Sequence, residues 1–145
     1  MSLFSAIGVS ATGMSAQRLR AEVIAQNLAN ADTTRTPDGG PYRRRDVIFE
    51  SSESSLAFDS VLQDQVGQGL TGVQVSEIRV DHEEAPKKYL PGHPDADKDG
   101  YVAMPRVNPA EDMVDLLSAS RGYQANVAAV SAVKDMIQRS LELFR

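Results

Sequence analysis

An acidic run in the second half of the chain has the residue types and spacing of a calcium ligand set. In Asp95–Gly100 (DADKDG) three aspartates alternate and a glycine follows them, as in the first half of a helix-flanked calcium loop. The last position of such a loop carries a bidentate glutamate, but here it is Arg106. The prolines of residues 91–94 (PGHP) also prevent a helix before the loop. The run is therefore predicted to be an Asp/Gly turn that leads into a strand beginning at Tyr101, with a calcium sensor as a rival interpretation.

The remaining candidates for chemistry form no catalytic or metal-binding pattern. The two histidines, His82 and His93, are neither at helical spacing nor part of a zinc protease motif. The chain has no cysteine, which excludes thiolate nucleophiles, disulfides and Cys-based zinc sites. No serine stands in a nucleophile elbow, and the glycines of residues 67–72 lack the lysine of a phosphate-binding loop. We therefore predict that the protein is not an enzyme and uses no cofactor, metal or small-molecule substrate.

The composition is that of an ordinary folded protein with an acidic surface, at 41% apolar and 24% charged residues. The net charge of −5 repels a phosphate backbone, and the one basic run, Arg43–Arg45, is followed at once by Asp46. No stretch approaches the roughly 18 apolar residues of a membrane span. The first twenty residues lack the early positive charge and continuous apolar run of a cleaved signal peptide. We therefore expect no nucleic-acid binding and no membrane insertion.

Residues 1–32 are predicted to form a long helix with an apolar stripe. The glycines and serines in its first half weaken this helix, since each glycine costs about 1 kcal/mol relative to alanine. Small residues also permit close approach of a second backbone, so a helix completed by its partners and a flexible tail are both open. The stripe consists of Leu3, Ile7, Met14, Ala21, Ile24 and Leu28.

Residues 109–145 carry a stronger helical pattern. Asn108 can cap the helix and Pro109 suits its first turn. About 36 residues at 1.5 Å each give a rod of roughly 50 Å, which needs a long partner. Gly122 inside this helix predicts close packing there. The apolar residues at intervals of seven are Leu116, Tyr123, Val130, Ile137 and Phe144, and the interleaved ones are Met113, Val127 and Leu141. The apolar residues predicted to lie off the main seams are Val9, Val23, Val114, Val133 and Met136.

Residues 33–108 differ from both ends in their prolines, glycines and charges. Alternation at Val73 and Val75, and again at Ile78 and Val80, predicts strands. The segment 54–66 fits either a short helix or a strand. Because each terminal helix needs a partner, we expect them to pack on each other. The predicted fold class is α+β, with an antiparallel, coiled-coil-like pair of terminal helices and a small β-rich middle region.

Two motifs in the sequence resemble a known family. They are AQNLANADT at residues 25–33 and GHPDADKDGYVAMPRVNPAEDMVDLLSASRGYQANVAAVSAVKDM at residues 92–136. Both resemble the bacterial flagellar rod, hook and filament-axial superfamily, and the second resembles its C-type proximal rod subunits in particular. Arg106 departs from that pattern, where an asparagine is expected.

The resemblance implies a structural subunit that assembles helically with copies of itself and with other rod proteins. The membrane ring and export gate would lie at the base and the distal rod above. It implies export through the flagellar type III pathway without a cleaved signal, and a place in the periplasmic part of the basal body. There the subunit would transmit torque and form part of the export channel wall.

The candidate assembly residues are the stripe and seam positions of both terminal helices together with three asparagines, Asn27, Asn30 and Asn126. The asparagines could form helix-to-helix hydrogen bonds or act in capping and on the surface. A helical adaptor or export chaperone that clasps one partner is the alternative function.

Overall fold

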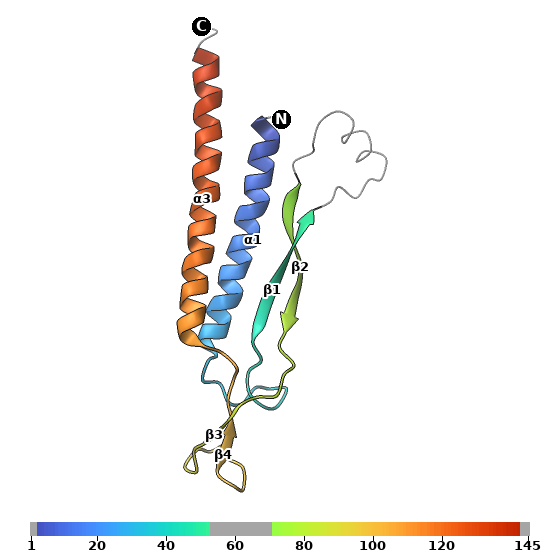
Figure 1. The fold of residues 1–145 in the computed structure, drawn as a ribbon, viewed down its shortest axis with the longest axis vertical. Helices are drawn as coiled ribbons and strands as arrows, with labels where there is room; N and C mark the ends of the chain where they lie inside the picture. Colours follow the sequence, from blue (N-terminus) through green and yellow to red (C-terminus); the bar gives the residue numbers. More distant parts are fainter. Residues whose placement is uncertain (1–2, 53–70, 143–145) are drawn as a thin grey trace, which may run out of the picture.

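Over the part of the chain that the structure describes, two long helices and two small sheets make up the fold (Figure 1). The structure is a computed structural model that describes residues 3–52 and 71–142. Its elements are α1 (Leu3–Ala29), β1 (Arg45–Ser52), β2 (Gly72–Val80), β3 (Lys87–Tyr89), β4 (Tyr101–Ala103) and α3 (Pro109–Glu142). β1 pairs with β2 and β3 pairs with β4, both antiparallel. The predicted α+β class with paired terminal helices is confirmed, whereas the segment 54–66 and Phe144 lie outside the described residues.

The two helices run antiparallel, and α1 lies between α3 and the β1–β2 ribbon (Figure 1). α3 has 34 residues and α1 has 27, so the C-terminal end of α3 extends beyond the N-terminal end of α1 (Figure 1). The β3–β4 pair lies at the opposite end of the molecule, beyond the α1–α3 turnaround (Figure 1). The molecule is therefore elongated, with helices at one end and a small β tip at the other.

The start of α3 follows the predicted capping pattern. The Ala110 backbone N–H donates to Asn108 Oδ1 at 3.2 Å, and the Asp112 N–H donates to the Asn108 carbonyl at 3.0 Å. Pro109 occupies the first helical position, where its missing N–H leaves no gap in the helix ladder. The helix thus begins where its sequence predicts.

Small and polar residues form the seam between α1 and α3. A Cβ at Gly13 would lie 3.1 Å from the Asn126 amide, and a Cβ at Gly122 would lie 3.2 Å from the Gln17 side chain. Each glycine thus lies under an amide side chain of the opposite helix. The close packing predicted at Gly122 is confirmed.

The α3 seam is displaced by one residue from part of the predicted pattern. The interleaved positions of α3 that face α1 include Asp112, Ala119 and Val133, which are buried. Met113 and Val127, which were predicted at interleaved positions, are exposed. The prediction that Val133 lies off the seam is therefore wrong. Val23 is also buried, at 3% exposed, but its spacing of four and seven residues from Leu19 and Ala16 puts it on the side of α1 that faces β2. The heptad pattern favoured Met113 and Val127 as seam residues because they are large and apolar. Two helices that pack closely instead place the smaller or polar neighbours of these residues in the seam.

The β1–β2 ribbon contains a β-bulge. Ile48 pairs with Glu77 while Phe49 pairs with Val75, so Ser76 is the extra residue. This bulge coincides with the change of phase in the predicted alternation, from Val73 and Val75 to Ile78 and Val80. The predicted strand is therefore one element, β2, with the phase change built into it.

The acidic run forms the predicted turn. Asp97 Oδ1 accepts hydrogen bonds from the N–H groups of Asp99 and Tyr101. Gly100 has a φ of +81°, a left-handed conformation that a glycine adopts without strain. Asp95 instead accepts from the Thr34 hydroxyl at 2.8 Å. The aspartates thus hold two loops together, and β4 begins at Tyr101 as predicted.

Candidate assembly site: a polar junction and an exposed helical face

A polar junction ties the C-terminal end of α1 to the start of β1. Asn27 is completely buried and makes three hydrogen bonds. Its Nδ2 donates to the Arg45 carbonyl at 2.7 Å, and its Oδ1 accepts from the Tyr42 hydroxyl at 2.9 Å and from the Arg45 N–H at 3.0 Å. One side chain therefore satisfies both main-chain groups of Arg45, where the chain enters the sheet.

The same junction reaches α3 through an ion pair. Arg44 Nη1 lies 3.0 Å from Asp112 Oδ1, and Arg44 Nε donates to Asp46 Oδ1 at 3.1 Å. Asp112 is completely buried, but neither of its carboxyl oxygens accepts a hydrogen bond within the described residues. We call Asn27, Tyr42, Arg44, Arg45 and Asp112 the polar junction. It joins α1, β1 and α3 at the turnaround of the helix pair.

Burial controls the electrostatics of the junction. Desolvation raises the pKa of Asp112, and the Arg44 guanidinium only partly opposes this. Burial acts to lower the pKa of Arg44, but the hydrogen bond and charge of Asp46, together with the charge of Asp112, outweigh it and the net pKa is raised. Burial also raises the pKa of Tyr42. Asp112 is therefore a carboxylate held where its charge is poorly solvated.

We expect the stability contributed by Asp112 to depend on pH with a defined sign. A raised folded-state pKa means that the native chain binds this proton more readily than the unfolded chain does. The contribution is therefore absent at neutral pH and grows as the pH falls through the raised pKa toward the ordinary value of about 3.9. Urea unfolding of wild type and Asp112→Asn between about pH 7 and pH 4 tests this. The wild type should gain stability relative to the variant on acidification, and a constant difference would contradict the burial argument.

The structure distributes the predicted assembly residues over three environments. Two are buried: Ile24 and Asn27. Nine are half-buried: Ile7, Met14, Ala21, Leu28, Asn30, Leu116, Asn126, Val130 and Ile137. Five are exposed: Leu3, Met113, Tyr123, Val127 and Leu141. The side chains of the first two groups are thus covered at least in part within the chain, and those of the third are left exposed.

The three predicted asparagines have different local roles. Asn27 bonds to the loop and strand that follow α1, not to α3. Asn30 Nδ2 donates to the Gln26 carbonyl at 2.9 Å, at the end of α1. Asn126 Nδ2 donates to the Gly122 carbonyl of its own helix at 2.9 Å while its amide packs on Gly13. The two alternatives were helix-to-helix hydrogen bonds and a capping or surface role. Among the described residues, none of the three asparagines makes a helix-to-helix hydrogen bond.

The outward face of α3 exposes several large apolar side chains, most closely spaced near the start of the helix. Met113 is 55% exposed, Val114 66% and Leu117 60%, and Met136 and Leu141 are exposed further along the same helix. Such a concentration of large apolar side chains in contact with water is typical of a surface that is covered by another chain.

Neither a metal centre nor a membrane span is found in the described ranges. Residues 3–52 and 71–142 contain no cluster of three or more histidine or acidic side chains arranged to hold a metal ion. Neither helix is sufficiently long and apolar over this part of the chain to cross a membrane.

Sequence reasoning missed the buried roles of Arg44 and Asp112. Arg44 was considered only as part of the basic run that precedes Asp46, and Asp112 was not singled out. Tyr42 was not identified at all. The loop between Asn27 and the Tyr42–Asp46 segment shows that the chain can turn back on itself there. The sequence does not show which side chains meet after the turn.

Paired helices from the two chain ends, a close small-residue seam and an outward apolar face define a helical building block for assembly. Comparisons with known proteins specify the family. Residues 7–35 match the family model described as flagella basal body rod protein. Residues 98–143 match the one described as flagellar basal body rod FlgEFG protein C-terminal.

Full-length relatives give the particular family. The chain is 44% identical to the flagellar basal-body rod protein FlgC of Borreliella burgdorferi, over 100% of this chain and 99% of that protein. It is 42% identical to FlgC of Bacillus subtilis and 39% identical to FlgC of Salmonella typhimurium, over 99% of this chain in each case and 99% and 98% of those proteins. The chain belongs to the FlgC family of flagellar basal-body rod proteins, and is thus a structural protein of the basal body and not an enzyme.

Proposed function

We propose that the chain is a subunit of the proximal rod, where it assembles helically with copies of itself and with other rod proteins. The outward apolar face of α3 is the observation that carries this proposal, because Met113, Val114 and Leu117 are all more than half exposed in the single chain. In a rod, neighbouring helices would cover that face. The small residues of α1 and α3 suit the same purpose, since they allow helices to approach closely.

The proposed mechanism is mechanical. A helix of 34 residues is roughly 50 Å long, and its antiparallel partner and the polar junction brace it at one end. Torque would pass along these helices and through lateral contacts, and the helices would form part of the export channel wall. We further propose that the chain is exported without a cleaved signal and acts in the periplasm. The membrane ring and export gate would then lie on one side of it and the distal rod on the other.

A charge placed in the helix seam is expected to abolish this function. Val130 is half-buried on α3, and an aspartate there would lose its hydration on assembly without gaining a partner. Val130→Asp should abolish swimming and remove the chain from isolated basal bodies while its expression stays normal. Val130→Leu, which keeps an apolar side chain, should still support swimming. Normal motility of Val130→Asp would contradict the proposal.

An adaptor or export chaperone is the alternative function, and the state of the free chain separates the two. A chaperone would be a stably helical monomer or dimer. A rod subunit should gain order at the far helix ends only on assembly. Circular dichroism and hydrogen exchange on the purified chain distinguish these outcomes. Full protection of both helix ends in the free chain would favour the adaptor.

A further inference from the structure

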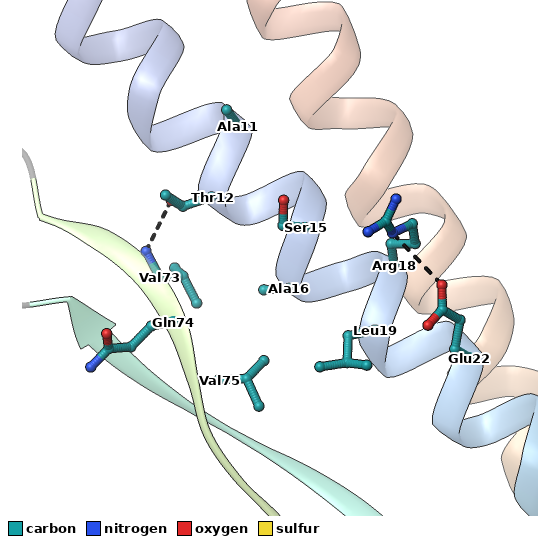
Figure 2. Close-up of a pocket in the computed structure, with 10 residues that line it drawn as sticks. All are labelled: Ala11, Thr12, Ser15, Ala16, Arg18, Leu19, Glu22, Val73, Gln74 and Val75. Carbon is teal, nitrogen blue, oxygen red and sulfur yellow. Dashed lines mark hydrogen bonds and ion pairs between the residues drawn. The ribbon is translucent and has the colours of Figure 1, made fainter.

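An apolar groove lies between α1 and the edge strand β2. Figure 2 shows its lining residues, with Ala16 and Leu19 of α1 facing Val73 and Val75 of β2. Its volume is about 490 Å³, within the range of ~300–1,000 Å³ that is usual for binding clefts. No side chain of the described residues, 3–52 and 71–142, fills it.

The groove is closed at one end by a close contact. The Thr12 hydroxyl accepts a hydrogen bond from the Val73 N–H at 3.1 Å (Figure 2). It also donates to the Val9 carbonyl at 2.8 Å. A Cβ at Gly72 would lie only 2.7 Å from Thr12 Oγ1, so a glycine is required where the strand meets the helix. At its other end α1 is joined to the ribbon through Asn27 and Arg45, and Arg45 pairs with Val80 of β2. The groove thus lies between two fixed contacts of helix and ribbon.

The same chain carries a ridge that matches the groove in chemistry. Met113 and Leu117 lie one helical turn apart near the start of α3 and are 55% and 60% exposed. The adjacent Asp112 is completely buried, which places the ridge on a different flank of α3 from the face that contacts α1. α3 and the β1–β2 ribbon lie on opposite sides of α1 (Figure 1). Groove and ridge are therefore on different sides of one molecule.

An exposed cation of the groove and an exposed anion beside the ridge have opposite sign. Arg18 and Glu22 both line the groove and lie 3.7 Å apart, and the Arg18 side chain remains 72% exposed. Glu111 is exposed and lies two residues before Met113 in the first turn of α3. A ridge that enters the groove would bring this carboxylate toward the Arg18 guanidinium.

We propose that the α1–β2 groove receives the Met113–Leu117 ridge of a second copy of this chain, with Glu111 of that copy facing Arg18. The inference rests on the proposed rod function and names the lateral contact within it. Because groove and ridge differ, the contact is heterologous, and repeating it generates an open series of copies and not a closed pair.

The geometry also gives the contact a stagger along the long axis. Gln17, within the groove segment of α1, packs on Gly122, whereas the ridge lies five to nine residues closer to the base of α3. Successive copies would therefore be displaced by roughly 10 Å along the helices. A displacement of this kind produces a helical arrangement and not a flat ring.

Engineered cysteines test the contact directly, since the native chain contains none. Ser15 lines the groove and lies at the level of the Gly13–Asn126 and Gln17–Gly122 contacts, roughly 10 Å along the axis from Leu117. Ser15→Cys with Leu117→Cys cannot close a disulfide within one chain at that distance. Mild oxidation of basal bodies from cells that express the double variant should give a ladder of covalent oligomers. Each single variant should give none.

Three results would overturn the inference, and one of them also overturns the rod function. Absence of the ladder, with the double variant present in the basal bodies, contradicts only the groove contact. Cross-linking by Leu117→Cys alone would show a symmetric contact and contradicts it too. Absence of the wild-type chain from basal bodies would remove the proposed function itself.

As a second measurement, Arg18→Glu and Glu111→Arg should each reduce rod incorporation, and the double exchange should restore it. Failure of that restoration would contradict the charge pairing.

Discussion

Replacement of Asn27 by leucine is expected to destabilise the folded chain by about 3–5 kcal/mol, because it takes the partner from three polar groups that meet at a completely buried side chain. Those groups are the Tyr42 hydroxyl and the N–H and carbonyl of Arg45. Leucine has the same number of side-chain heavy atoms and the same branch point and is somewhat larger, so the substitution opens no cavity and the loss comes from unsatisfied polar groups. Urea unfolding followed by circular dichroism measures the loss.

Asn30→Leu is the matched control for this prediction. Asn30 stands three residues later at the end of the same helix. Its side chain donates an exposed hydrogen bond to the Gln26 carbonyl and accepts one from the Thr33 hydroxyl at 3.2 Å. Water replaces such a bond at little cost, so we expect a change of less than about 1 kcal/mol. Equal effects at Asn27 and Asn30 would show that both asparagines act only as helix-end residues and that the polar junction contributes little.

The polar junction also explains why the chain ends can depend on their neighbours. All three bonds of Asn27 lie within the chain, so the turnaround of the helix pair is held without help from another subunit. At the other end, α3 extends past α1 (Figure 1), and Leu141 is 67% exposed. The subunit is therefore braced at one end and open at the other. This arrangement fits a chain that completes its packing during assembly.

The elements of the fold could be predicted from sequence because their signals are local. Asn108 and Pro109 mark the start of α3, and the glycine of the acidic run marks the turn before β4. The shift in the apolar alternation between Val75 and Ile78 is the sequence trace of the bulge at Ser76. Two strands separated by a loop would have produced the same alternation. Such signals require only neighbouring residues, so the sequence displays them directly.

The face of α3 that packs on α1 could not be predicted in the same way. A heptad pattern scored by apolar size selects Met113 and Val127, but the seam instead uses their smaller or polar neighbours. The reason is the reciprocal contact of glycines and amides, in which Gly13 lies under Asn126. This contact exists only when both helices are present, so neither helix reveals it alone. The larger apolar residues are consequently left for the outer surface, where an assembling subunit needs them.

Gly13→Leu is expected to force the two helices apart and to destabilise the chain by about 2 kcal/mol or more, because inserted volume in a close-packed seam is not accommodated. Even a Cβ at Gly13 would lie 3.1 Å from the Asn126 amide, and Asn126 is held by its bond to the Gly122 carbonyl at 2.9 Å. Thermal unfolding of the purified chain and incorporation into basal bodies are the measurements.

Gly8→Ala in the same helix should have the opposite effect. A Cβ at Gly8 meets no atom within 4 Å, so the substitution adds helix propensity of up to about 1 kcal/mol without a clash. If Gly13→Leu were as stable as Gly8→Ala, the glycine would serve no purpose in helix approach. If instead Gly8→Ala stabilised the free chain but impaired rod incorporation, the exposed glycine would be a contact for a neighbouring subunit. The pair of variants thus separates the packing of the helices within a subunit from the packing between subunits.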